Sequence, residues 1–249
     1  MPNNEQSFQF QEEHLQNISL EDDTQIFNKK GLHFVHLNCN SLINKIDEIR
    51  EFVLHANPHV ICFSETKLDP TITSAEIDIN GYSNIRHDRN RHGGGVACYV
   101  SNSIHYNERT DFSKDFENIF IDILLPKTTP ILLGVVYRPP STLNFNELLS
   151  NSIANANSFD NQEVYILGDI NVNLLDRKKK FILKKGYRFS NDESNYTTPL
   201  YLTKKYVELL RTHGLTQLIE EPTEQPTQQV HSWTTYLSIH LLRLPNLVL

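Results

Sequence analysis

The chain has 249 residues, which is enough for one large domain with a substantial core. Hydrophobic residues make up 39% of the sequence and aromatic residues 10%, a composition that excludes a wholly disordered chain. The formal net charge of −7 argues against a protein that coats nucleic acid by bulk electrostatics, although two local basic segments occur at 86–92 and 177–185.

Cysteine usage and the absence of targeting patterns bear on where the protein acts. Cys39, Cys62 and Cys98 are odd in number and far apart, so we predict a reducing compartment and no disulfide-linked partner. Residues 1–25 lack the basic start and apolar stretch of a secretion signal. Because no run approaches the roughly 18 apolar residues of a membrane span, we expect an intracellular protein without a membrane partner.

The first elements along the chain form a strand–helix–strand unit. Residues 1–30 are polar and acidic and predict a disordered leader. An apolar run at 32–38 predicts a strand, and the segment 41–56 carries apolar residues on one helical face. Pro58 ends that helix, and 59–65 is the next predicted strand.

The middle of the chain predicts two hairpins. Apolar or alternating runs separated by turn residues predict four strands, at 81–87, 93–101, 119–125 and 131–137. The run from Gly93 to Gly95 lacks the Lys and Ser/Thr of a phosphate-binding P-loop and precedes a strand instead of a helix. We therefore interpret these glycines as part of the first hairpin.

Later segments complete a mixed pattern of helices and strands. A helix is predicted at 144–157, a strand at 164–169, and a second helix at 201–213 that stops at Gly214. Strands outnumber helices and are connected both by hairpins and by crossovers. This pattern predicts an α/β or α+β domain with mixed sheets and excludes a doubly wound dinucleotide-binding domain.

Polar side chains recur where the predicted buried strands end. These residues are Asn38 and Asn40 after the first strand, Glu65 after the second, Tyr137 after the fourth hairpin strand, and Asp169 and Asn171 after the strand at 164–169. Each set alone fits local turn chemistry, as Gly168 before Asp169 indicates. Four sets at the same ends of four core strands predict one shared cleft.

The residue types in this cleft suit one kind of chemistry. Two carboxylates, Glu65 and Asp169, can hold a hard divalent cation such as Mg²⁺ with several waters left on it. The amides of Asn38 and Asn171 can donate to phosphate oxygens without adding charge, and Tyr137 can donate to an oxyanion or a leaving oxygen. The set therefore predicts metal-assisted phosphodiester hydrolysis.

The same residues, in this order, resemble a known superfamily. With the segments CFSETKL, GGGVACYVS, GVVYRPP and GDINVN around them, they resemble the endonuclease/exonuclease/phosphatase superfamily. The sequences of these motifs are most similar to the apurinic-endonuclease-like domain of non-LTR (LINE-type) retrotransposon polyproteins. The resemblance covers 31–222 and implies a DNase I-like, four-layer α/β sandwich in which two mixed β-sheets pack between helices.

The resemblance also implies a role for each site residue. Glu65 would be the principal ligand of Mg²⁺ or Mn²⁺, and Asn38 would help position metal and phosphate. Asp169 would orient or deprotonate the attacking water, Asn171 would bind the scissile phosphate, and Tyr137 would assist there. The expected activity is DNA nicking with a 3′-hydroxyl leaving group, which would prime a reverse transcriptase of the parent polyprotein in the nucleus.

The end of the sequence departs from that family. The family's last motif pairs an Asp with a His, yet no Asp or Glu follows Glu224, and His231 and His240 have no acidic neighbour in sequence. We therefore expect 223–249 to be an aberrant tail of a truncated or frame-shifted copy that lacks the final strands. Because a general acid or base contributes about 10²- to 10⁴-fold, such a copy would have weak activity or none.

Two alternative functions stay open at this point. The acidic net charge favours a phosphomonoesterase or phospholipase of the same fold over a DNA enzyme. The chain is alternatively a non-catalytic remnant that binds nucleic acid through the basic segments at 86–92 and 177–185.

Overall fold

The protein is described here by a computed structural model that covers most of the chain between residues 31 and 242. The described ranges are 31–142, 144–156, 162–172, 182–183, 186–187, 200–218 and 237–242. The predicted leader at 1–30, most of the basic segment at 177–185 and most of the predicted tail at 223–249 lie outside these ranges. Within them, no helix has both the length and the apolar character needed to cross a membrane.

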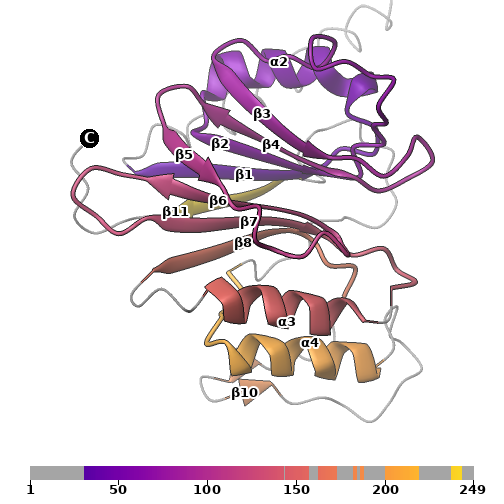
Figure 1. Ribbon diagram of the computed structural model, residues 1–249, viewed down its shortest axis with the longest axis vertical. Coiled ribbons are helices and arrows are strands. Elements are labelled where there is room, and N and C mark those ends of the chain that lie inside the picture. The colour runs from indigo at the N-terminus through magenta and orange to yellow at the C-terminus, as the bar shows by residue number, and fades with distance from the viewer. Residues whose placement is uncertain are drawn as a thin grey trace, which may run out of the picture.

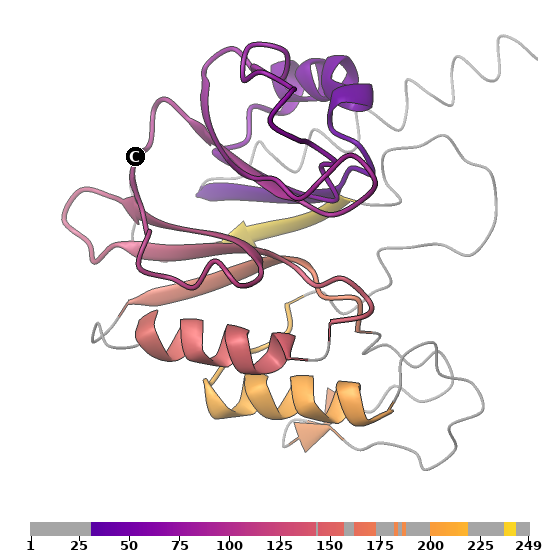
Figure 2. The same cartoon turned by 45° about the vertical axis from the view of Figure 1, so that its right-hand side comes forward.

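The described elements form four layers (Figure 1), and the turned view in Figure 2 shows the same order. Two β-sheets pack face to face in the middle. Helix α2 (Ile46–Ala56), which follows the short 3-10 turn η2 (Ile43–Lys45), covers the outer face of the first sheet. Helices α3 (Phe145–Ala156) and α4 (Leu200–Thr212) lie on the second sheet. The four-layer sandwich expected from the sequence is confirmed.

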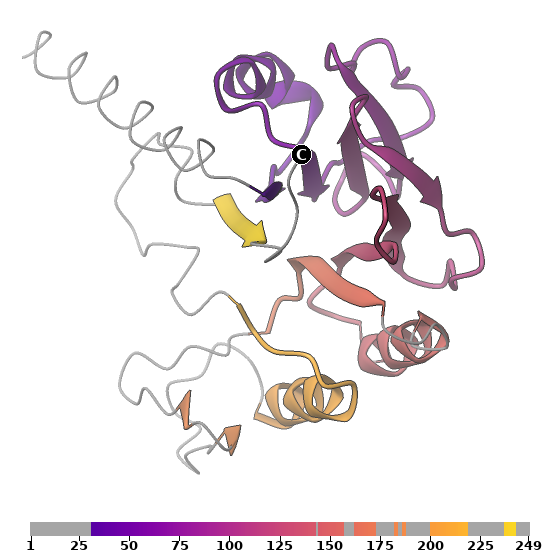
Figure 3. The ribbon, with the colours of Figure 1, turned by 90° about the vertical axis from the view of Figure 1, so that its left-hand side faces the viewer.

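The first sheet has five strands in the order β11-β1-β2-β4-β3. These are β1 (Leu32–Asn38), β2 (Val60–Ser64), β3 (Tyr82–His87), β4 (Val96–Ser101) and β11 (Leu237–Leu242). The β1–β2 pair is parallel and the other pairs are antiparallel, so the sheet is mixed as predicted. The sequence predicts no strand after 222, whereas Figure 3 shows β11, in yellow, at the edge of this sheet beside β1.

The second sheet has four strands in the order β5-β6-β7-β8. These are β5 (His105–Glu108), β6 (Glu117–Leu124), β7 (Ile131–Tyr137) and β8 (Glu163–Asp169). The β7–β8 pair is parallel and the others are antiparallel. A separate two-stranded ribbon consists of β9 (Ile182–Leu183) and β10 (Gly186–Tyr187). Both predicted hairpins are present, as β3–β4 and β6–β7.

Alternating side chains of the strands fill separate cores on the two faces of each sheet. Between the sheets, residues such as Phe34 and Cys62 belong to the same buried cluster as Ile121 and Leu133. The rings of Phe34 and Tyr165 meet edge to face across the two sheets, with centroids 6.2 Å apart. Because β1, β2, β7 and β8 are packed in this way, their carboxyl ends are held in fixed positions relative to one another.

Candidate active site

The candidate site lies where β1, β2, β7 and β8 end, and side chains from both sheets meet there. Asn38 Nδ2 donates to Glu65 Oε1 at 3.1 Å and to Asp169 Oδ2 at 2.9 Å. Tyr137 Oη donates to the same Glu65 oxygen at 3.2 Å. The structure therefore brings together four residues that are up to 131 positions apart in the sequence, and the fifth, Asn171, lies beside Asp169.

Glu65 is presented by an unusual backbone conformation just beyond β2. Its φ of +52° is in the left-handed region, which non-glycine residues rarely adopt. Backbone hydrogen bonds hold this segment in place. Cys39 N donates to Ser64 O at 3.0 Å, and Ser41 N and Leu42 N donate to Glu65 O and Thr66 O, each at 2.9 Å. A strained backbone conformation persists only where surrounding contacts fix it, and such residues are common at functional sites.

A tight turn after β8 presents Asp169 and Asn171. Gly168 has a φ of +145°, and a Cβ there would lie 1.8 Å from Val136 O, so the strand accommodates no side chain at this point. Asp169 Oδ1 accepts from Asn171 N at 2.9 Å, and Asn171 Nδ2 donates to Arg138 O at 2.8 Å. The sequence leaves two interpretations of this segment open, a structural turn or a set of polar functional groups. In the structure, Gly168, Asp169 and Asn171 do both: they close the turn and present the polar groups.

Burial and charge shift the acid–base properties of two site residues. Burial raises the pKa of Asp169 above its ordinary value of 3.8, and the nearby charge of Glu65 raises it further, against hydrogen bonds from Asn171 N and Asn38. The pKa of Tyr137 is also raised, first by burial and then by the Glu65 carboxylate. Tyr137 therefore stays protonated near neutral pH and acts as a hydrogen-bond donor.

The donor set fits a hard divalent cation. Glu65 and Asp169 share the Asn38 amide, and the repulsion between the two carboxylates would be relieved by a cation close to both. Across the part of the chain that the structure describes, no three His, Cys, Asp or Glu side chains gather as a metal-binding cluster. A metal here would thus depend on two carboxylates, an amide and water, the ligand set in which Mg²⁺ keeps several waters.

Two further residues at the site were not singled out from the sequence, although both lie in the quoted motifs. Lys67, in a left-handed conformation with a φ of +51°, donates through Nζ to Asn40 Oδ1. Arg138 follows Tyr137 directly and is 2% exposed. No sequence pattern singles out Arg138, because an arginine just beyond the end of a strand is usually exposed.

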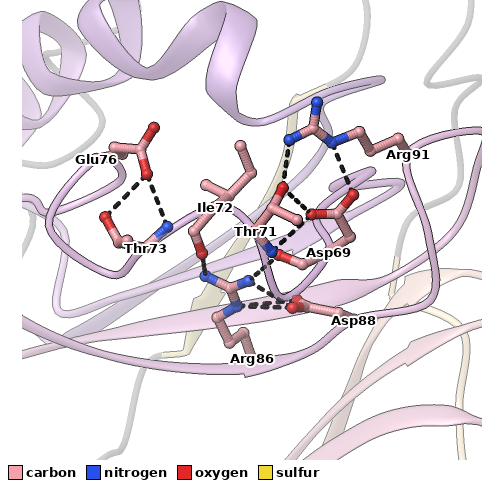
Figure 4. A network of polar contacts seen from close by, with 8 residues as sticks. All are labelled: Asp69, Thr71, Ile72, Thr73, Glu76, Arg86, Asp88 and Arg91. Carbon is pink, nitrogen blue, oxygen red and sulfur yellow. Dashed lines mark hydrogen bonds and ion pairs between the residues drawn. The ribbon is translucent and has the colours of Figure 1, made fainter.

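The basic segment at 86–92 is largely neutralised by acidic partners, as Figure 4 shows for two of its arginines. Arg86 binds Asp88 through Nε and Nη2 and also donates to Asp69 O. Arg91 Nε donates to Asp69 Oδ2 at 2.7 Å, and its Nη2 donates to Thr71 Oγ1. These contacts connect β3 with the loop after Glu65, so a structural role explains these two cations.

The third arginine of this segment explains the triple glycine. Arg89 Nη1 donates to Glu117 Oε1 at 2.9 Å, and Gly95 N donates to the other oxygen of this carboxylate. A Cβ on Gly94 would lie 2.5 Å from Glu117 Oε2 and 2.6 Å from Arg89 Cζ, and the φ of Gly94 is +72°. The backbone at 93–95 thus passes directly against an ion pair. This close approach requires glycine, in addition to the place of these residues in the hairpin.

Comparisons with known proteins agree with this architecture. The profile described as "Endonuclease/Exonuclease/phosphatase family" matches residues 35–236. The endonuclease domain of TRAS1, a telomere-specific non-LTR retrotransposon, is similar with a TM-score of 0.54 and 11% identity over 78% of this chain and 77% of that chain. A search of curated proteins gave no match.

Two AP endonucleases are also similar. LMAP from Leishmania major has a TM-score of 0.49 and 18% identity, over 57% of this chain and 55% of that chain. An AP endonuclease from Archaeoglobus fulgidus has a TM-score of 0.46 and 19% identity, over 57% of this chain and 58% of that chain. The similarity thus spans little more than half of either enzyme.

The family assignment follows from the extent of the profile match and from the fold. The match begins inside β1 and ends just before β11, so it includes all five site residues. The two mixed sheets with flanking helices agree with the TRAS1 domain in fold. The chain belongs to the endonuclease/exonuclease/phosphatase family.

Proposed function

We propose that the protein hydrolyses phosphodiester bonds of DNA as a nicking endonuclease, with Mg²⁺ or Mn²⁺ as its cofactor. The observation that carries this proposal is the hydrogen-bonded set in which Asn38 and Tyr137 converge on Glu65 and Asp169. Two carboxylates, an amide and a phenol at the junction of two sheets provide groups for holding a cation, orienting water and contacting phosphate.

Each residue has a distinct task in this proposal. Glu65 and Asn38 would hold the cation, and the Asn38 amide links the Glu65 and Asp169 carboxylates. Asp169 accepts a proton from the attacking water, since its raised pKa makes it a stronger base than an ordinary aspartate once ionised. Asn171 binds the scissile phosphate, and Tyr137 donates to a phosphate oxygen. The bound cation would supply positive charge for the phosphate oxygens and the leaving group.

The choice of DNA over other phosphodiesters is supported by the structural neighbours. The fold matches the endonuclease domain of TRAS1, which is described as part of a telomere-specific non-LTR retrotransposon. Together with the motif sequences GVVYRPP and GDINVN, this structural similarity supports a retrotransposon origin, a reverse transcriptase in the parent polyprotein, and a nuclear site of action.

The test is nicking of supercoiled plasmid by the purified full chain with and without Mg²⁺. Enzyme is used in excess over plasmid, because the Asp-His pair expected from the resemblance is not visible in the sequence. We expect Mg²⁺-dependent open-circle product from the parent and a loss of at least about 10²-fold with Glu65→Gln. Asp47→Asn, with a side chain 90% exposed on α2, is the matched acidic control.

Three outcomes would contradict the proposal. The parent makes no open-circle product with either Mg²⁺ or Mn²⁺, or Glu65→Gln nicks as fast as the parent, or Asp47→Asn loses as much activity as Glu65→Gln. Phosphate released from inositol phosphates without any DNA nicking would instead favour the phosphomonoesterase alternative.

A further inference from the structure

Arg138 is a charged residue that is buried beside the candidate site and donates to backbone carbonyls. Its Nη1 donates to Ile170 O at 3.4 Å and to Asn171 O at 3.2 Å. Its Nη2 donates to Pro140 O at 3.2 Å and to Thr142 O at 3.1 Å. One guanidinium group therefore bridges two loops, the one that follows β7 and the one that follows β8.

The bridge occurs where the two strands can no longer pair. The register of β7 with β8 ends at Tyr137 and Asp169, and the loop continues with Pro139 and Pro140, which have no backbone N–H to donate. A buried charge without hydrogen bonds is costly. The guanidinium of Arg138 avoids this cost, because its planar fork presents several N–H donors at once and the carbonyl oxygens of both loops accept from them.

Arg138 also contacts the turn that carries Asp169 and Asn171 through its backbone. Arg138 N donates to Asp169 O at 2.9 Å, and Arg138 O accepts from Asn171 Nδ2 at 2.8 Å. Asn171 itself has a φ of +50°, a conformation that an asparagine adopts at some cost. The turn is thus held by the backbone N–H, the carbonyl and the guanidinium of a single residue.

We propose that Arg138 is a positioning residue that fixes the turn at 169–171 against the loop at 138–142, so that Asp169 and Asn171 face the substrate. The inference rests on the proposed function for its catalytic consequence and on the four carbonyl contacts for the positioning itself. A lysine at this position could place one ammonium group near one loop, but it lacks the fork that spans both.

The test compares Arg138→Met and Arg138→Lys with Arg109→Met in the full chain. Arg109 is the matched control, because its side chain is 11% exposed and it binds the carboxylates of Asp111 and Asp122. Hydrogen–deuterium exchange is followed in peptides that contain 141–142 and 170–171. We expect exchange there to be at least about tenfold faster in both Arg138 variants and unchanged in Arg109→Met.

The catalytic readout is the division of the effect between kcat and KM, measured in a steady-state form of the nicking assay with plasmid in excess over enzyme. Under saturating Mg²⁺, we expect kcat to fall about 10- to 100-fold in Arg138→Met with KM for plasmid within about twofold, since Arg138 acts through Asn171 and Asp169. In Arg138→Lys, the logarithm of kcat should fall by more than half as much as it falls in Arg138→Met. Arg109→Met should keep the parent's kcat at temperatures where it is folded.

Distinct results overturn the two proposals. Unchanged exchange at 141–142 and 170–171 in both Arg138 variants would overturn the positioning role, as would a rise in KM with an unchanged kcat. A parent chain that does not nick DNA would defeat the proposed function, whereas the exchange measurement would still decide whether Arg138 holds the turn. If Arg138→Met does not fold, Arg138→Lys alone carries both readouts.

Discussion

Burial raises the pKa of Asp169, and the nearby charge of Glu65 raises it further. In Glu65→Gln the charge is removed while a side-chain oxygen can still accept from Asn38 and Tyr137. We therefore expect the pKa of Asp169 to fall in Glu65→Gln. NMR titration of the Asp169 carboxyl carbon measures the change.

The control for that titration is Glu76→Gln. Glu76 accepts from Thr73 N at 2.8 Å on an exposed loop and does not contribute to the pKa of Asp169. A pKa of Asp169 that stays the same in Glu65→Gln, or that falls equally in Glu76→Gln, would mean that the two site carboxylates do not interact.

The raised pKa of Asp169 also predicts how stability depends on pH. The folded protein keeps a proton on Asp169 at pH values where the unfolded chain, with a pKa near 3.8, has lost it. The stabilising contribution is therefore complete below pH 3.8 and is lost as the pH rises through the folded-state pKa. We expect Asp169→Asn, which cannot ionise, to gain stability relative to the parent as the pH rises across that window.

Urea unfolding of both proteins at several pH values between 3.5 and 7 measures this difference. A difference in free energy of unfolding that is constant over the whole range, or that changes in the opposite direction, would contradict the raised pKa.

Gly168 is the residue with the least tolerance for a side chain. In Gly168→Ala the new Cβ would lie 1.8 Å from Val136 O, so β7 and β8 must separate locally, and we expect a loss of about 3 kcal/mol or more. Gly81→Ala is the matched control, since its φ is +86° but no atom lies within 4 Å of its Cβ, and it should lose about 1–2 kcal/mol. Chemical denaturation of the two variants tests the difference, and equal losses would contradict the close approach.

At the scale of elements, the loop after Glu65 and the end of β3 stabilise each other through the contacts in Figure 4. Arg86, with a side chain 16% exposed, binds Asp88 and donates to the carbonyls of Ile72 and Asp69. We expect Arg86→Met to lose about 2–4 kcal/mol, because it leaves a half-buried carboxylate and two carbonyls without their donor. Thermal and urea unfolding give the loss.

Arg91→Met is the comparison within the same segment. The Arg91 side chain is 57% exposed in its pair with Asp69, so its removal should cost no more than about 1 kcal/mol. A larger loss for Arg91→Met than for Arg86→Met would contradict the assigned roles of the two arginines.

The strands that the sequence predicts well are those with continuous apolar runs. The predicted ranges 32–38 and 131–137 coincide with β1 and β7, because both strands are buried on two faces and their runs have clear polar ends. β5, with the sequence HYNE, is a short polar edge strand, and no apolar pattern indicates it. β11 depends on pairing with β1, a partner that local sequence cannot reveal.

The sequence was enough to predict that four polar side chains would meet at the strand ends, but not the geometry of their meeting. Residue types at strand ends indicated that Asn38, Glu65, Tyr137 and Asp169 would meet, and their hydrogen bonds agree. The left-handed backbone of Glu65 and the carbonyl contacts of Arg138 follow from tertiary constraints between segments far apart in the chain. The catalytic roles of these residues stay predictions.

At the scale of the whole molecule, the reaction rates of the three buried thiols measure the unfolding of the sandwich. Cys62 and Cys98 are cross-strand partners in the core between the sheets, and Cys39 is buried beside the site. Burial raises the pKa of Cys39 to about 12 and that of Cys62 above its ordinary value. We expect all three thiols to react with an aromatic disulfide reagent at a rate set by unfolding.

Labelling in native buffer and in increasing urea tests this expectation. The rates of Cys62 and Cys98 should rise together, since separating the sheets exposes both. Reaction of either thiol in native buffer at the rate of a free cysteine peptide would contradict the closed core.

The pairing of β1 with β11 sets an order of events for a chain that grows from its amino end. β1 and β2 are close in sequence and can pair early, whereas Leu32 meets its partner Leu242 roughly 200 residues later. Until those residues leave the ribosome, the strand that carries Asn38 has an open edge with unpaired N–H and C=O groups. A nascent chain of this protein should therefore depend on protection of that edge during synthesis more than a sandwich whose neighbouring strands are all close in sequence.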